Sequence, residues 1–301
     1  MEVKPRRFMN KTKGIIMAGG TGSRLFPITK AINKHLLPVY DKPMIYYPLS
    51  TLMLCGLREI ALITNAEDKH HFQKLLGDGT DIGIQITYVN QPKASGIAEA
   101  YRLCADFLGS SNSVLILGDN IFIGHGFGEL LSENLVDNGA LIFGCPVQDP
   151  ENYGVIELDS KQNIISIEEK PIQPRSKLAI PGLYFFDNQA VDFATNLKYS
   201  SRNELEIIDL LNLYLNKNEL RVRIVPRGTG WLDAGNVESL FAASDFVKTL
   251  QTRQGLNLNV PEEIAFNKGW ISFNQLERLA NGMSNTGYEK YLKSLLKRSQ
   301  E

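Results

Sequence analysis

The sequence has few of the features that would place it outside the ordinary globular class. It contains only three cysteines, Cys55, Cys104 and Cys145, without the spacing of metal ligands, which indicates reduced thiols. No apolar run approaches the ~20 residues that a membrane span needs. The formal net charge of −1 argues against broad nucleic-acid binding. We therefore expect a cytoplasmic protein that binds neither a membrane nor nucleic acid.

Residues 1–13 differ from the rest of the chain. They are basic, contain Pro5 and lack the apolar core of a signal peptide, so we expect a flexible tail. Residues 14–240 show no internal repeat and no linker, and we expect them to form one catalytic domain that includes a sugar-binding part. Residues 241–301 should form a helical region, at an oligomer or regulatory interface.

Short apolar runs alternate with segments of helical periodicity in the first half of the chain. Strands are predicted over residues 14–18, 59–64, 84–89, 113–117 and 140–147, and helices over residues 45–55, 68–76, 96–108 and 127–137. This alternation predicts an α/β fold with three α/β/α layers, a mostly parallel mixed sheet and a Rossmann-like arrangement.

The pattern changes after Tyr153. Residues 154–159 and 164–169 predict a β-hairpin. The remaining predicted strands cover residues 182–186 and 220–226, and the remaining predicted helices cover residues 190–197, 205–216 and 238–253, with further helix to the end of the chain.

A glycine-rich loop follows the first predicted strand. It consists of Gly19, Gly20, Thr21, Gly22, Ser23 and Arg24. The glycines leave backbone N–H groups free to point at an anion, and the Arg24 guanidinium suits a polyphosphate. The loop matches neither the P-loop nor the dinucleotide motif. Taken alone, it is as typical of a plain strand-to-helix turn as of a phosphate site.

Three charged residues are candidates for a site with this loop, and Asp119 stands at a strand end, where ligands bind in an open α/β sheet. Asp119 directly follows the apolar strand 113–117, Asp233 follows an apolar-aromatic segment, and Lys34 precedes another apolar stretch. Such residues commonly cap turns or face solvent. Joining two phosphates, however, needs a hard cation, and Mg²⁺ takes only one or two carboxylates.

The sequence around these residues resembles the glucose-1-phosphate thymidylyltransferases. The resemblance is carried by the glycine loop with Arg24, by Lys34 and, most specifically, by the stretch LPVYDKPMIYYPLS at residues 37–50; it extends over about residues 14–296. It implies a Mg²⁺-dependent enzyme that joins dTTP and glucose 1-phosphate into dTDP-glucose and pyrophosphate, the first step of dTDP-rhamnose synthesis. It also implies a homotetramer built as a dimer of dimers.

The resemblance assigns roles on the nucleotide side. Asp119 and Asp233 match the two metal-binding aspartates, and Asp119 also lies at the nucleotide. The glycine loop holds the phosphates, and Gln91 and Gly96 match the segment that reads the base. A glutamine amide has both a donor and an acceptor for the imide edge of a pyrimidine. This suits thymine and uracil equally.

On the sugar side, Glu169 is expected to bind hydroxyls and Lys170 the sugar phosphate. Residues expected to line the same pocket are Tyr153, Gly154, Ile180, Tyr184 and Trp231. As isolated residues, Tyr184 and Trp231 are more often part of a core. Arg24, Lys34 and Lys170 are the expected catalytic residues.

Several positions depart from the family pattern. His35 replaces a glutamine, Ser95 an aspartate, and Ala234 and Asn236 two threonines, which leaves the choice between dTTP and UTP and the exact sugar open. Asn267 stands where an arginine commonly holds nucleotide phosphate at a regulatory site, so weakened feedback inhibition by a dTDP-sugar is predicted.

Three other functions remain open from the sequence. The first is the same chemistry with UTP or a modified hexose 1-phosphate. The second is a glycosyltransferase, which would not need Arg24 for a triphosphate. The third is a nucleotide-sugar sensor without activity. The intact glycine loop, Arg24, Asp119, Lys170 and Asp233 argue against it.

Overall fold

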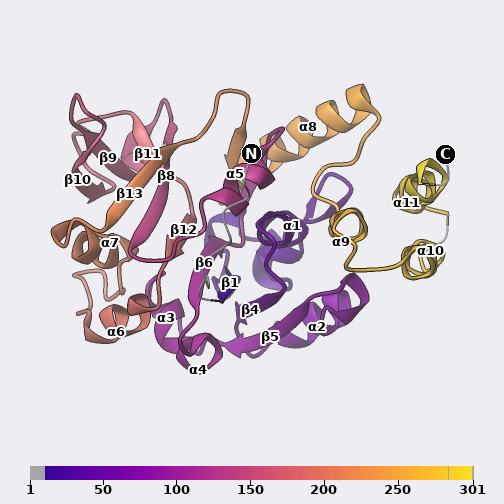
Figure 1. The fold of residues 1–301 in the computed structure, drawn as a ribbon, viewed down its shortest axis with the longest axis horizontal. Coiled ribbons are helices and arrows are strands. Elements are labelled where there is room, and N and C mark those ends of the chain that lie inside the picture. Colours follow the sequence, from indigo (N-terminus) through magenta and orange to yellow (C-terminus); the bar gives the residue numbers. More distant parts are fainter. Residues whose placement is uncertain (1–10, 284, 300–301) are drawn as a thin grey trace, which may run out of the picture. The chain divides into compact units, whose positions relative to one another are not determined.

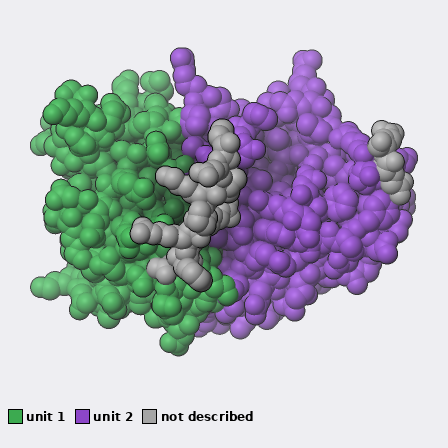
Figure 2. Space-filling model, in the orientation of Figure 1, with its two compact units in different colours: residues 1–15, 95–115, 134–225 green, residues 16–94, 116–133, 226–301 purple. Residues whose placement is uncertain are grey.

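The computed structural model describes residues 11–283 and 285–299 (Figure 1). Two compact units are interleaved along the chain. Unit 1 contains residues 1–15, 95–115 and 134–225, and unit 2 contains residues 16–94, 116–133 and 226–301 (Figure 2). Strands β1 (Thr12–Met17) and β6 (Asn112–Leu117) each begin in unit 1 and end in unit 2.

Unit 1 contains a mixed sheet around the buried strand β8 (Ala140–Pro146). Strands β12 (Leu183–Phe186) and β11 (Leu178–Ile180) pair with β8 in the antiparallel sense, whereas β13 (Leu220–Ile224) pairs with it in parallel. The hairpin of β9 (Gly154–Leu158) and β10 (Ile164–Glu169) joins the sheet through β11. The helical elements are α3 (Glu99–Leu103), α4 (Ala105–Leu108), η5 (Pro150–Asn152), α6 (Gln189–Asn196) and α7 (Ile207–Asn216).

Unit 2 contains the parallel pair β4 (Glu59–Thr64) and β5 (Gln85–Asn90). Two small antiparallel pairs are β7 (Asn120–Ile123) with β14 (Gly230–Asp233), and β2 (Pro38–Val39) with β3 (Lys42–Pro43). The α-helices are α1 (Tyr46–Leu54), α2 (Lys69–Leu76), α5 (Phe127–Glu133), α8 (Val237–Gln254), α9 (Pro261–Asn267), α10 (Phe273–Asn281) and α11 (Gly287–Arg298). The 3₁₀ turns are η1 (Ser23–Leu25), η2 (Ile28–Lys30), η3 (Lys34–Leu36) and η4 (Thr80–Ile82).

The predicted α/β class with a mixed central sheet and C-terminal helices is confirmed. Two predicted helices are shorter in the structure. The helix predicted over residues 96–108 begins only at Glu99 and is interrupted at Cys104, and α5 ends at Glu133. Gly96 cannot start a helix because its φ is 99° and its neighbours Ser95 and Ala98 hydrogen-bond with the backbone of Leu205.

Helix α1 contains the C-terminal part of the most specific stretch of the sequence, residues 37–50. The helix is buried from Tyr47 to Met53 and packs against α5, α9 and β7 within unit 2. A helix that is apolar on all sides belongs in a core. The segment before it, Lys34 to Ile45, is thereby fixed at one end.

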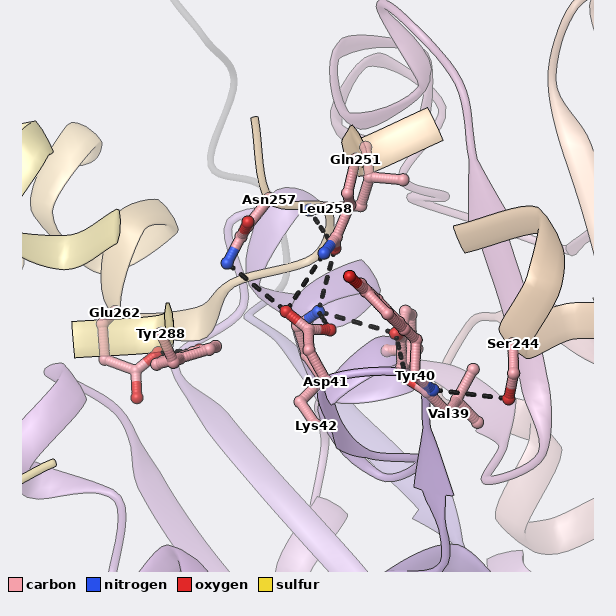
Figure 3. A network of polar contacts seen from close by, with 11 residues as sticks. Val39, Tyr40, Asp41, Lys42, Ser244, Gln251, Asn257, Leu258, Glu262 and Tyr288 are labelled. Atoms are coloured by element: carbon pink, nitrogen blue, oxygen red, sulfur yellow. Dashed lines mark hydrogen bonds and ion pairs between the residues drawn. The ribbon is translucent and has the colours of Figure 1, made fainter. Parts of the chain in front are cut away.

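The β2–β3 hairpin is fixed by polar contacts around Asp41 and Lys42 (Figure 3). Asp41 accepts hydrogen bonds from Lys42 Nζ at 2.6 Å, Gln251 Nε2 at 3.1 Å and Asn257 Nδ2 at 3.3 Å. The Gln251 side-chain oxygen in turn accepts from Lys42 Nζ and from the backbone N–H of Leu258. Burial lowers the pKa of the Lys42 ammonium, and the Asp41 carboxylate opposes that shift.

Glu262 is a buried carboxyl beside this network. Tyr288 donates a hydrogen bond of 2.7 Å to it, and burial raises its pKa above the ordinary value. A raised folded pKa contributes stability that is complete below the unfolded pKa and is lost as pH rises through the folded pKa. We therefore expect Glu262→Gln, which keeps an acceptor for Tyr288, to raise Tm at neutral pH by roughly 2 °C.

The gain from Glu262→Gln should shrink as pH falls toward the ordinary glutamate pKa of about 4.3. Thermal denaturation of both proteins across that pH range measures the difference. Glu277→Gln, an exposed position on α10, makes the same charge change and should leave Tm nearly unchanged. A lower Tm for Glu262→Gln at neutral pH would mean that the ionised carboxylate stabilises the fold.

Three further expectations concern the termini, the thiols and the membrane. Of the predicted tail, residues 1–10 lie outside the described residues, and β1 begins at Thr12. The predicted domain boundary at residue 240 falls within α8 and stays a prediction.

Cys55 and Cys104 are buried free thiols, and burial raises the pKa of each to about 12. Cys145 is half-buried. Across residues 11–283 and 285–299, no helix has the length and apolar character to span a membrane.

Candidate active site

The glycine loop packs against Gln91, which was predicted from the sequence to read the base. Gln91 follows β5 and is 3% exposed, and its N–H donates to the carbonyl of Thr64 at the end of β4. A Cβ on Gly19 would stand 2.2 Å from Gln91 Oε1. Only glycine lets the loop and this amide approach so closely. The structure therefore places two of the predicted nucleotide residues together.

The loop then turns toward Lys34. Gly22 has a left-handed φ of 62°, and a Cβ there would lie 3.2 Å from Lys34 Cβ. Thr29 holds this turn by donating a hydrogen bond of 2.7 Å to the Gly22 carbonyl. Thr21, Ser23 and Arg24 stay exposed. Their side chains are accessible to a ligand, as a phosphate-binding loop requires.

The position of Arg24 is fixed by its neighbour Leu25 in the short η1 turn. Leu25 is fully buried in an apolar cluster that includes Val39, Ile121 and Ala234. Because Leu25 is anchored there, the adjacent guanidinium of Arg24 projects from a fixed backbone. This places its fork of donors on the exposed side of the loop.

Lys34 and Asp119 form the central charged pair of unit 2. The Lys34 ammonium contacts Asp119 Oδ2, and Asn120 Nδ2 donates to Asp119 Oδ1 at 3.1 Å. Burial acts to raise the pKa of the Asp119 carboxyl, but the Lys34 charge and the hydrogen bonds from Lys34 and Asn120 outweigh it and hold the pKa below its ordinary value. Asp119 is therefore an ionised carboxylate at neutral pH.

Asp233 is brought beside Asp119 by strand pairing. Asp233 pairs with Asn120 in the β14–β7 register, and the N–H of Ala234 donates to the Asp119 carbonyl at 3.0 Å. A Cβ on Gly235 would stand 2.9 Å from both Asp233 Oδ1 and Arg24 Nη2. Glycine at this position lets the carboxylate and the guanidinium converge.

The two aspartates fit a magnesium ion that is completed by phosphate oxygens and water. Among the described residues, no group of three or more His, Cys, Asp or Glu side chains could hold a metal. A pair of carboxylates suits Mg²⁺, which takes one or two carboxylates and keeps several waters.

Trp231 lies in unit 2, next to the candidate metal ligands. Its indole N–H donates to Asn120 Oδ1 at 2.7 Å, and Asn120 donates to Asp119. The sequence assigned Trp231 to the sugar pocket only. In the structure it also orients the amide that holds Asp119. Gly96, assigned to the base, lies in unit 1 against the backbone of Leu205.

Five of the predicted sugar residues converge in unit 1. Gly154 pairs with Glu169 across the hairpin and with Ile180 across β11, and the Lys170 N–H donates to the Tyr153 carbonyl at 3.0 Å. A Cβ on Gly154 would stand 3.3 Å from Glu169 Oε2, so this glycine leaves room for the carboxylate. Tyr184 is 4% exposed and stacks on Phe186, as expected of a core residue.

Lys170 and Arg202 flank Glu169 with positive charge. Lys170 Nζ lies 3.9 Å and Arg202 Nη2 3.8 Å from Glu169 Oε1. Lys170 has a φ of 44°, a strained conformation for a side-chain-bearing residue that often marks a functional site. Burial raises the pKa of Glu169, while Lys170 and Arg202 act to lower it.

Arg202 was not predicted from the sequence. It stands in a charged loop before α7, which by composition is indistinguishable from a solvated turn. Only its 2.8 Å ion pair with Glu206 and its approach to Glu169 mark it as part of this cluster.

Comparison with known proteins identifies the family of this chain. A family model described as nucleotidyl transferase matches residues 13–249, which contain every candidate residue named above. The chain belongs to the nucleotidyl transferase family. The match runs through both units and ends within α8.

This nucleotidyl transferase has close relatives of nearly equal length. A glucose-1-phosphate thymidylyltransferase from Xanthomonas campestris pv. campestris (strain B100) is 52% identical over 291 residues, covering 96% of this chain and 99% of the relative. Another from Mycobacterium tuberculosis (strain CDC 1551 / Oshkosh) is 48% identical over 287 residues, covering 95% and 100%.

Solved structures share the fold of this nucleotidyl transferase. A Bacillus anthracis protein crystallised with a sucrose has a TM-score of 0.72 and 42% identity, covering 78% of this chain and 94% of that chain. A UDP-glucose pyrophosphorylase complexed with UDP-glucose has a TM-score of 0.68, covering 80% and 100%. Its identity of 23% supports the fold alone.

Proposed function

We propose that this nucleotidyl transferase is a glucose-1-phosphate thymidylyltransferase. It joins dTTP and glucose 1-phosphate to form dTDP-glucose and pyrophosphate, the first step toward dTDP-rhamnose or another deoxysugar. The observation that supports this most strongly is the convergence of the glycine loop, Arg24, Lys34, Asp119 and Asp233 in unit 2. Relatives about half identical over nearly the whole chain carry this name.

The reaction needs positioning and charge stabilisation more than acid–base chemistry. The attacking oxygen of a sugar 1-phosphate is already anionic, so no strong base is required for in-line attack on the α-phosphorus. Arg24 and the loop N–H groups would hold the leaving pyrophosphate. Lys34 would neutralise charge at the α-phosphate.

Asp119 and Asp233 would hold Mg²⁺ at the phosphates. When bound, the ion supplies a Lewis acid that neutralises charge on the phosphoryl oxygens. Lys34 contacts Asp119 before ligands bind, so its ammonium must leave that carboxylate to reach a phosphate. Asn120 and Trp231 would keep the carboxylate oriented meanwhile.

The cluster in unit 1 suits the second substrate. Glu169 offers acceptors to sugar hydroxyls, and Gly154 leaves room for the ring to approach the backbone. Lys170 and Arg202 provide two cations for a sugar phosphate. Gln91 would read the pyrimidine edge shared by thymine and uracil.

Pyrophosphate release from a matrix of substrates tests the proposal. dTTP and UTP are each combined with glucose 1-phosphate and with amino- and deoxy-hexose 1-phosphates, with and without Mg²⁺. We expect the highest kcat/KM for dTTP with glucose 1-phosphate and no turnover without the metal. A preference for UTP or a modified hexose would assign the same chemistry to another pair, and transfer from a finished nucleotide sugar would indicate a glycosyltransferase.

We also propose that the protein is a homotetramer, a dimer of dimers with the C-terminal helices near an interface. The resemblance to the family supports this. Sedimentation equilibrium gives the mass directly, and a monomer at micromolar concentration would contradict it.

A cavity of about 560 Å³ in unit 2 is the proposed regulatory site, lined by residues that include Phe122, Gly124, Glu263 and Asn267. Asn267 carries no charge for a nucleotide phosphate. We expect dTDP-rhamnose to inhibit weakly, and Asn267→Arg to lower its IC50 about tenfold, the scale of a hydrogen bond to a charged group.

Inhibition curves at fixed substrate concentrations measure this effect. Asn274→Arg on the exposed face of α10 adds the same charge away from the cavity and should leave IC50 unchanged. Strong inhibition of the parent protein would refute the role given to position 267.

A further inference from the structure

Lys34 stands between two buried polar side chains, Asn33 and His35. Asn33 is 5% exposed and His35 2% exposed, while the Lys34 ammonium between them reaches Asp119. A lysine side chain has a flexible stem of four carbons, so the position of its ammonium depends on how firmly its backbone is held. Asn33 and His35 therefore fix the backbone position from which the Lys34 side chain extends.

Asn33 connects the lysine segment to the start of the glycine loop. Its Nδ2 donates to the Ala18 carbonyl at 3.1 Å and to Asp68 Oδ2 at 2.8 Å. Ala18 immediately precedes Gly19. Because both amide hydrogens are used in this way, the Oδ1 atom faces the other direction, toward His35.

The Asn33 oxygen holds His35 twice. It accepts from the His35 backbone N–H at 3.0 Å and lies 2.8 Å from His35 Nδ1. Since an amide oxygen can only accept, the imidazole carries its proton on Nδ1. Burial, reinforced by the Lys34 charge, lowers the pKa of His35 to about 3, so the ring is neutral.

His35 also packs against the backbone that leads into Asp119. A Cβ on Gly118 would stand 2.6 Å from His35 Cδ2. On the other side, the His35 carbonyl accepts from the N–H of Ile45, just before the buried helix α1. The His35 imidazole thus lies against Gly118, the residue before Asp119, and hydrogen-bonds to Asn33 on the other side of Lys34.

We propose that Asn33 and His35 are positioning residues that fix Lys34 relative to Asp119 and the glycine loop. The inference rests on the proposed nucleotidyl transfer. Neither side chain touches the reacting atoms: Asn33 sets the backbone of Lys34 against Ala18, and His35 sets it against Gly118. Misplacing a catalytic group by 1 Å costs about a hundredfold in rate, so kcat should respond more than KM.

The test compares four variants in the pyrophosphate assay. Asn33→Ala should lower kcat roughly tenfold to a hundredfold with KM changed less than about twofold. His35→Leu fills the ring volume without an N–H and should lose as much. His35→Gln keeps a side-chain donor for Asn33 and should retain kcat within about threefold. Asn112→Ala removes an equally buried asparagine from unit 1 and should lower Tm without changing kcat.

A double-mutant cycle separates positioning from a general structural role. In a Lys34→Arg background, Asn33→Ala should cost less than about threefold, because the geometry it protects is already lost. Independent, multiplicative losses would overturn the proposal. So would equal kcat for His35→Leu and His35→Gln, or normal kcat for Asn33→Ala.

A spectroscopic readout does not depend on activity. ¹⁵N NMR of histidine-labelled protein should show His35 as the neutral Nδ1–H tautomer, and Asn33→Ala should remove that signature. An Nε2–H tautomer in the parent protein would overturn the proposal even if the enzyme were active. Absence of pyrophosphate release by the parent protein, with the tautomer as stated, would instead refute the proposed function.

Discussion

The Asp119→Asn variant should turn over about a thousandfold more slowly than the parent protein, since carboxylate binding of Mg²⁺ supplies several kcal/mol of charge stabilisation. The substitution keeps the shape of the side chain and its place after β6. It removes the negative charge that Lys34 contacts and Asn120 supports. Initial rates over a range of MgCl₂ concentrations should show both a lower kcat and a higher metal requirement.

Asp233→Asn should behave in the same way, because the β14–β7 pairing places Asp233 opposite Asn120, the residue that follows Asp119. Asp245→Asn, an exposed position on α8, is the matched control and should have parental kinetics. If Asp119→Asn and Asp233→Asn kept normal turnover and the parental Mg²⁺ dependence, neither aspartate would be a metal ligand.

Arg24→Ala should reduce kcat about a hundredfold or more, the usual cost of removing one group that stabilises developing charge. Its guanidinium and the Asp233 carboxylate both reach the space above Gly235, where a triphosphate with its metal would sit. Leu25 anchors the loop independently, so the fold should persist. The KM for glucose 1-phosphate should hardly change.

Arg24→Lys distinguishes charge from shape. It keeps one positive charge and loses the planar fork of donors, so an intermediate kcat is expected. Arg253→Ala, an exposed position in the last turn of α8, controls for the loss of an arginine in unit 2. A change confined to the KM of the sugar phosphate would assign Arg24 to the other substrate.

Elements with a clear local sequence pattern were predicted well. Strands β4 and β6 are uninterrupted apolar runs, and the β9–β10 hairpin is two alternating segments around a polar turn. Strands β7, β11 and β14 were missed because each has only three or four residues and depends on a partner far along the chain. The β7–β14 pair, for example, joins Phe122 to Trp231.

The candidate site divides in the same way. Arg24, Lys34 and Asp119 follow motif and strand-end rules, and the structure places Lys34 against Asp119 as expected of one site. Arg202 could not be predicted, because its significance lies in a 3.8 Å approach to Glu169 across the fold. The contribution of Asn33 was hidden for a similar reason: its partners are a carbonyl, a carboxylate and an imidazole on separate turns.

The contact between Lys34 and Asp119 makes each charge the placeholder for a ligand of opposite sign. A phosphate that binds Lys34 alone would leave the buried Asp119 carboxylate without a cation, and a cation that binds Asp119 alone would leave the Lys34 ammonium without an anion. If Mg²⁺ and the triphosphate bound together, Asp119 and Lys34 would each keep a partner of opposite charge. The Lys34–Asp119 pair therefore disfavours binding of the metal alone or of the triphosphate alone, and favours binding of the two together.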